Sequence, residues 1–124
     1  MQPRPTASEL LAVVAEVLER DIVPALTGPA QHQARVAANL VGIVEREIRL
    51  APDQAVRETD ALRSVLPDVD GSDLVGARAQ FAAALRAGFA DDPAVDAETW
   101  AMLFASVRDD LAICKPGHDV WQGD

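Results

Sequence analysis

Apolar residues recur along this chain at three- and four-residue steps, which is the period of an α-helix. The longest unbroken run covers residues 31–50. Its apolar side is formed by Val36, Leu40, Ile43, Val44 and Ile48. Small residues widen this side beyond a single stripe, so we expect a central helix whose apolar side is core and contacts more than one neighbour. The helix is predicted to stop at Ala51 and Pro52, because proline removes a backbone donor from a helix interior.

A first helix is expected before the central one. Thr6 and Glu9 have the spacing of a capping box, in which each side chain accepts from the backbone N–H of the other residue. Its buried side is predicted to comprise Leu10, Leu11, Val14, Val17, Leu18 and Ile22. Pro24 and the Gly28–Pro29 pair then end it.

Further helices are expected after the central one. Sparser apolar positions over residues 53–66 predict a shorter and more exposed helix. The turn-rich loop DVDGSD, at residues 68–73, precedes a helix that runs toward Gly88. Asp96 or a close neighbour caps a last helix, which ends before Lys115.

Strand patterns are missing from the sequence. No segment alternates apolar and polar residues over a useful length, and no Asn-Gly or Asp-Gly turn lies between two β-branched runs. With 124 residues the chain is long enough for one self-sufficient core. We therefore predict an all-α, single-domain bundle of four to five helices over residues 1–124, with a polar tail at about residues 115–124.

The charge of the chain limits its partners. Acidic residues outnumber basic ones by 20 to 11, so the net charge is −9 and neither nucleic acid nor an anionic membrane is expected to bind. No apolar segment reaches the roughly 20 residues of a membrane span. Cys114 is the only cysteine, which rules out an internal disulfide, and the first residues lack the order of a signal peptide. These features predict a cytoplasmic protein.

Patterns typical of metal sites and enzymes are also missing. Neither His32 nor His118 has a Glu three residues before it, and one cysteine cannot form a thiolate cluster. In the loop at residues 68–73 an EF-hand would need glycine at Asp73 and glutamate at Ala79. No Gly-rich phosphate loop, G-x-S-x-G elbow or H-E-x-x-H is found. We predict no metal, no cofactor and no catalytic residue, and these absences disfavour an enzymatic function without deciding it.

Polar residues on the central helix are the candidate ligand site. This polar seam consists of His32, Arg35, Asn39, Arg46 and Arg49, and the first four of these are the candidate ligand-binding residues. As a binding site, its donors would hold a carboxylate, a phosphate or an acyl-CoA group beside Gly42. As a structural feature, its cations would pair with Glu16, Glu19 or aspartates of neighbouring helices. The structural interpretation is favoured, since charged stripes on helices are usually solvated or paired, and both stay open.

The aromatic residues all lie in the second half of the chain. They are Phe81, Phe89, Trp100, Phe104 and Trp121. Trp100 and Phe104, one turn apart, are expected to anchor the core. Trp121 in the tail is a candidate interface residue, because tryptophan is often a binding hot spot.

Four segments carry a resemblance to a known family: RPTASELLAVVAEVLERDIVPAL, HQARVAANLVGIVEREI, DGSDL and the late DDP. Together they resemble a family of short bacterial proteins that is catalogued as a domain of unknown function. The resemblance covers nearly the whole chain. Members of that family tend to be encoded beside an aminoglycoside-phosphotransferase-like kinase and an acyl-CoA-dehydrogenase-like enzyme. The resemblance thus implies a link to those enzymes, while the chain has neither a kinase catalytic loop nor a flavin-binding segment.

Two functional hypotheses follow. The first is a non-catalytic accessory protein that self-associates or binds such a kinase or acyl-CoA dehydrogenase. The second is a small-molecule binding protein or modest enzyme that uses the polar seam for an anionic or acyl-CoA-like ligand. A buried groove lined by the seam would favour the second, and a seam fully paired with carboxylates would favour the first.

Overall fold

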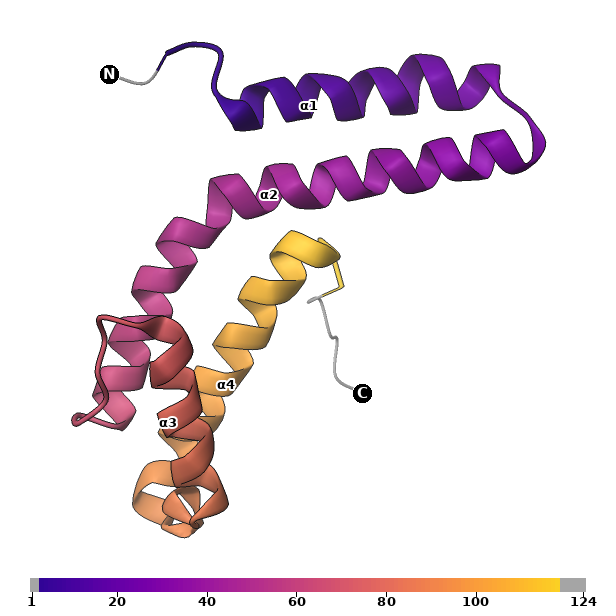
Figure 1. Cartoon of the computed structure of the whole chain (residues 1–124). Coiled ribbons are helices and arrows are strands. Elements are labelled where there is room, and N and C mark those ends of the chain that lie inside the picture. The colour runs from indigo at the N-terminus through magenta and orange to yellow at the C-terminus, as the bar shows by residue number, and fades with distance from the viewer. Residues whose placement is uncertain (1–2, 119–124) are drawn as a thin grey trace. The chain divides into compact units, whose positions relative to one another are not determined.

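The computed structural model describes residues 3–118, and they contain helices and turns but no strand. The four α-helices are α1 (Ala7–Val17), α2 (Gly28–Val65), α3 (Leu74–Arg86) and α4 (Pro93–Cys114) (Figure 1). Shorter helical turns are η1 (Leu18–Ile22), η2 (Val23–Ala25) and η3 (Phe89–Asp91). The all-α prediction is confirmed. The organisation as one domain over residues 1–124 stays a prediction.

The start of α1 is the capping box expected from the sequence. The Glu9 backbone N–H donates to Thr6 Oγ1 at 3.3 Å, and the Thr6 N–H donates to Glu9 Oε2 at 2.7 Å. Two of the donors that a helix N-terminus leaves without partners are satisfied in this way. This first helical segment continues beyond α1 through the π-turn η1 and ends with η2, which contains Pro24.

Helix α2 runs through Pro52 and ends at Val65 after 38 residues. The predicted stop at Pro52 and the separate helix over residues 53–66 were therefore wrong. A proline in a helix interior removes one donor and crowds the carbonyl four residues before it, at a cost of about 3 kcal/mol. The helical residues on both sides outweigh that cost here.

The ends of α3 and α4 follow the sequence signals closely. Gly88, the second residue after α3, has φ at +90°, a left-handed conformation that a glycine adopts without a Cβ clash. Helix α4 begins at Pro93, about one turn before the expected Asp96, and Asp92 Oδ1 caps it by accepting from the Ala94 N–H at 2.9 Å. Helix α4 ends at Cys114, directly before Lys115 as predicted.

The described chain divides into two compact units, and α2 and α4 contribute to both. The unit of residues 52–111 holds the main hydrophobic core. Its buried members are Leu62, Val65, Val69, Ala77, Phe81 and Met102. They come from the C-terminal part of α2, the following loop, α3 and α4, so three helices meet there.

Polar contacts reinforce this core at its edge. Arg78 of α3 makes two hydrogen bonds to the Glu58 carboxylate of α2, at 2.7 and 2.6 Å. The hydrogen bond with Glu58 raises the pKa of Arg78. Gln54 and Arg57 of α2 both bind Asp109 of α4, through its backbone carbonyl at 2.9 Å and its carboxylate at 3.1 Å. These contacts fix the register of α3 and α4 on α2 within the unit.

The loop at residues 68–73 is a turn, as its composition suggested. Asp70 Oδ1 accepts from the Ser72 N–H at 3.0 Å and from the Ser72 hydroxyl at 2.8 Å. These hydrogen bonds favour the charged carboxylate, first through the backbone donor and then through the hydroxyl, and lower the pKa of Asp70. The carboxylate is thus used to hold its own turn.

The other unit comprises the described residues up to Ala51 together with those from Ala112 onward. In it α1 and the N-terminal part of α2 lie side by side as a hairpin (Figure 1). Gln31 Nε2 donates to the Val23 carbonyl at 3.1 Å and closes the tip of this hairpin. Its described residues bury few apolar side chains, namely Val23, Ala38 and Ile113, and α1 buries none.

Candidate functional site

One residue of the polar seam, Arg46, has a structural partner. Its Nε donates to the backbone carbonyl of Ile113 at 2.7 Å, in the last turn of α4. Carbonyls in the last turn of a helix have no partner in their own helix, and a cation is favoured there by the helix dipole. A Cβ placed on Gly42 would lie 3.0 Å from Arg46 Nη1, so the glycine leaves room for the guanidinium.

We expect Arg46→Ala to lower the free energy of unfolding by about 1–2 kcal/mol, because the Ile113 carbonyl loses a charged donor. Arg35→Ala is the matched control on the same helix, and it should change the free energy by less than about 0.5 kcal/mol since Arg35 is exposed. Urea unfolding followed by circular dichroism measures both. Equal losses in the two variants would contradict a special role for Arg46.

Arg49 pairs with Glu45 of its own helix at 2.8 Å. The remaining seam residues are His32, Arg35 and Asn39. All are exposed, and within residues 3–118 their side chains make no hydrogen bond or ion pair. Of the two glutamates expected beside the seam, Glu16 accepts instead from Arg20 at 2.7 Å in a pair one helical turn apart. His32, Arg35 and Asn39 are therefore exposed along α2, whereas Arg46 is held by its hydrogen bond to α4.

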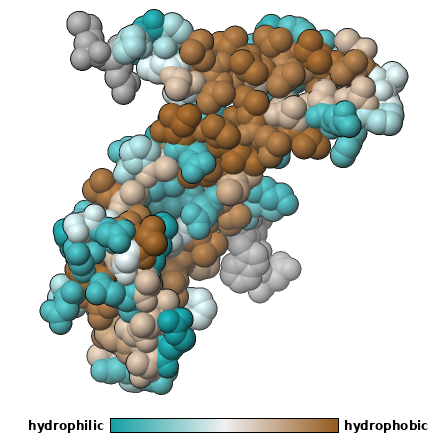
Figure 2. All heavy atoms as spheres, in the orientation of Figure 1, coloured by the Kyte–Doolittle hydropathy of each residue, from teal (hydrophilic) through white to brown (hydrophobic). Residues whose placement is uncertain are grey.

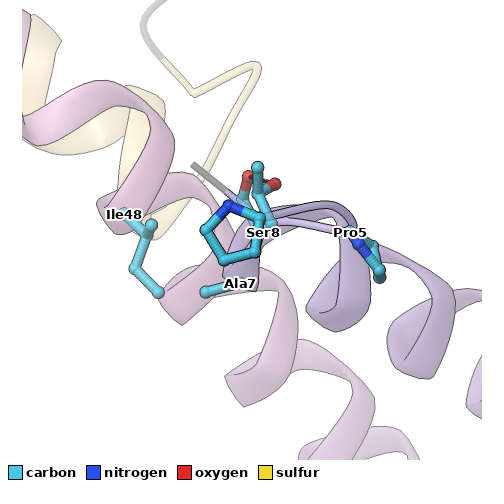
Figure 3. Close-up of a pocket in the computed structure, with 6 residues that line it drawn as sticks. Pro5, Ala7, Ser8 and Ile48 are labelled. Carbon is cyan, nitrogen blue, oxygen red and sulfur yellow. Dashed lines mark hydrogen bonds between the residues drawn. The ribbon is translucent and has the colours of Figure 1, made fainter. Parts of the chain in front are cut away.

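A hollow of about 420 Å³ lies at the open end of the hairpin. It is lined by Pro3, Pro5, Thr6, Ala7, Ser8 and Ile48 (Figure 3). None of the seam residues lines it, and its polar groups are hydroxyls of the capping region. The hollow offers no titratable group for acid–base or nucleophilic chemistry.

The most prominent feature of the hairpin is an apolar surface that α1 and α2 share. This hairpin face consists of Leu10, Val13, Val14, Val17, Ile22, Val36, Leu40, Val44 and Ile48. Their exposed fractions range from 38% to 58%. In Figure 2 the brown of apolar residues extends without a break across both helices.

The exposure of the hairpin face contradicts two predictions made from periodicity. The apolar side of the central helix was expected in the core, but Leu40 is 55% exposed and Val36, Val44 and Ile48 are exposed too. The expected buried side of the first helix is likewise exposed at Leu10, Val14, Val17 and Ile22. A signal was present in the sequence: α1 carries Val13 beside Leu10, so its apolar residues exceed what one neighbouring helix can cover.

A second apolar surface runs along α4. This aromatic stripe consists of Trp100, Leu103, Phe104 and Val107, at three- and four-residue steps. The prediction that Trp100 and Phe104 anchor the core was wrong, because their exposed fractions are 63% and 55%. Met102 and Thr99, next to them in sequence, are buried instead.

The aromatic stripe borders an open hollow of about 400 Å³. Its lining residues are Trp100, Ala101, Phe104, Ala105 and Arg108. Tryptophan, phenylalanine and arginine are enriched at protein contact surfaces. Trp121, the interface residue expected from the sequence, lies outside the described residues.

Residues 3–118 bring no three His, Cys, Asp or Glu side chains together as metal ligands would require. In the same part of the chain, no helix combines the length and the apolar character needed to cross a bilayer. Cys114 is exposed at the end of α4.

Comparison with known families gives one match. A model described as "Domain of unknown function (DUF6285)" matches residues 24–118. The chain belongs to this family. No curated protein and no solved structure matches it.

The DUF6285 match covers the whole of α2, α3 and α4, and it includes the polar seam and the aromatic stripe. It begins at Pro24, after α1 and η1. The α2 half of the hairpin face thus lies within the match, and the α1 half lies before it.

Proposed function

We propose that this chain is a non-catalytic helical interaction protein, and that the aromatic stripe of α4 is where it binds its partner. The observation that carries the proposal is the exposure of Trp100, at 63%, together with Phe104 one turn away. Aromatic side chains of this size are costly to leave in water and dominate the binding energy of many interfaces. Arg108 lies beside them, and arginine is likewise enriched at such surfaces.

The proposed partner is an enzyme of acyl-CoA or phosphotransfer metabolism. The resemblance described above associates such chains with an aminoglycoside-phosphotransferase-like kinase and an acyl-CoA-dehydrogenase-like enzyme. An accessory role agrees with the sequence, which has no motif of either enzyme. The chain would then contribute a binding surface and its partner the chemistry.

Co-purification with each of the two enzymes, followed by size exclusion with light scattering, tests the proposal. We expect co-elution at a defined stoichiometry with one of them. Trp100→Ala should weaken the complex by at least about 30-fold, which corresponds to the 2 kcal/mol or more of a hot spot. Val75→Ala is the matched control, because Val75 is 74% exposed on α3 and lies outside the stripe.

Separate elution from both enzymes would reject the proposed partners. Co-elution that Trp100→Ala leaves unchanged would reject the aromatic stripe as the binding surface.

A second candidate function is binding of a small anionic ligand by the polar seam. It is favoured by one observation, that Arg35 and Asn39 have no partner within residues 3–118. It ranks second because these side chains are exposed, and specific small-molecule sites are concave and bury most of their ligand. A thermal-shift screen with CoA thioesters and phosphorylated metabolites tests it, with Arg35→Ala abolishing any shift.

A further inference from the structure

We infer that the hairpin face is covered by the hairpin face of a second copy of this chain, so that two hairpins form one four-helix bundle. A pair of helices has no interior of its own: α1 buries no residue, and in α2 before Ala51 the buried side chain is Ala38. Helical stability in proteins comes mainly from packing an apolar face. The hairpin lacks that packing on the side where its largest apolar residues gather.

The size of the hairpin face agrees with that of a stable dimer interface. Nine valine, leucine and isoleucine side chains at about half exposure leave roughly 400 Å² of apolar surface, at about 60–120 Å² for each whole side chain. A standard interface buries about 800 Å² from each partner, somewhat more than half of it apolar. The hairpin face therefore supplies the apolar area that one copy of a symmetric dimer needs.

The charges of the hairpin favour a second copy in one particular order. Residues 3–27 carry two arginines and four carboxylates, a net charge of 2 − 4 = −2. Residues 28–51 carry three arginines and two glutamates, a net charge of 3 − 2 = +1. Placing α1 of one copy over α2 of the other brings opposite signs together, whereas α1 over α1 sets like charges against each other.

This order fixes which residues meet. The Gln31–Val23 hydrogen bond and the shared hollow of Ala7 and Ile48 place residues of α1 and α2 at equal height when their numbers sum to about 54. A two-fold axis parallel to the helices keeps that height between copies and makes all neighbouring helices antiparallel. Val14 of one copy then lies opposite Leu40 of the other.

The dimer inference does not depend on the proposed partner enzyme, because it concerns a different surface in the other compact unit. The purified chain alone suffices to test it, so either proposal can fail while the other stands. Size exclusion with light scattering over a dilution series should give about twice the 13.2 kDa chain mass.

Leu40→Asp should convert the dimer to a monomer, since it puts a charge in the centre of the hairpin face. Val75→Asp is the matched control, at an exposed valine outside that face, and should leave the dimer intact. Leu40→Ala is the milder variant, which should raise the dissociation constant about 10- to 100-fold while the helical circular dichroism signal persists. A monomer at every concentration of the unaltered chain would overturn the inference, and so would a dimer that none of these substitutions at Leu40 weakens.

Cross-linking tests the order of the helices. In chains that carry Cys114→Ser, a mixture of Val14→Cys and Leu40→Cys chains should form a mixed disulfide dimer under mild oxidation, because the two positions face each other. Each cysteine variant alone should cross-link poorly. Efficient cross-linking of Leu40→Cys with itself would overturn the α1-over-α2 order.

Discussion

Replacing Leu62 by alanine is expected to lower the free energy of unfolding by about 2–5 kcal/mol. Leu62 is 1% exposed and is the largest fully buried side chain among the described residues. It belongs to α2 and shares the core with Ala77 and Phe81 of α3 and Met102 of α4. The variant loses the transfer energy of the removed atoms and leaves a cavity that three packed helices cannot close completely.

Urea unfolding of the Leu62→Ala variant measures this loss as a lower midpoint. Val75→Ala is the control, since Val75 is 74% exposed and its replacement should stay within about 0.5 kcal/mol. A loss below about 1 kcal/mol at Leu62 would mean that the core collapses around the missing atoms, and it would contradict a tightly packed arrangement.

Replacing Pro52 by alanine is expected to raise the free energy of unfolding by about 1–3 kcal/mol. Pro52 lies inside α2, where it provides no N–H for the carbonyl of Ile48 and its ring crowds that carbonyl. Alanine restores the donor and has the highest helix propensity. Because this substitution adds stability, a higher urea midpoint cannot be mistaken for a general disturbance of folding.

Pro67→Ala is the matched control for Pro52→Ala, because Pro67 is exposed and follows the end of α2. Outside a helix, removing proline frees the unfolded chain and costs up to about 1 kcal/mol. A loss of stability at Pro52 as well would show that the local backbone needs the proline ring, and it would contradict the helix-interior argument.

Signals that act within a few residues could be read from the sequence. The Thr6–Glu9 capping box, the glycine after α3 at Gly88 and the acidic cap of α4 depend on neighbours in the chain, so their geometry follows from residue type and spacing. The Asp70 turn belongs to the same group.

Pro52 shows where a local rule fails. The rule states the cost of a proline correctly, but the outcome depends on how much helix stabilisation lies on either side. The packing of Leu62 and Val65, more than two turns later, supports the second half of α2 and is not visible at Pro52 itself. The residues next to Pro52 therefore do not decide whether the helix breaks there or continues.

Burial was predicted less well than secondary structure, for a related reason. The repeat of Val36, Leu40 and Val44 indicates a helix side that avoids water, but it does not indicate which molecule covers that side. The same holds for Trp100 and Phe104, whose size suggested a core. For Arg46 the sequence left a binding role and a structural role open, and its partner, a carbonyl in the last turn of α4 rather than a carboxylate, required the fold.

The position of the aromatic residues also determines which parts of this chain optical spectroscopy can detect. Residues 1–80 contain no aromatic side chain, so tryptophan emission and near-ultraviolet circular dichroism receive no signal from α1 or from any residue of α2. Trp100, with its indole largely in water, would emit at longer wavelength than a buried tryptophan and shift to shorter wavelength when a partner covers it. Loss of hairpin structure would be detected only through far-ultraviolet or amide-exchange signals, and two optical methods on one sample would then report two different transitions.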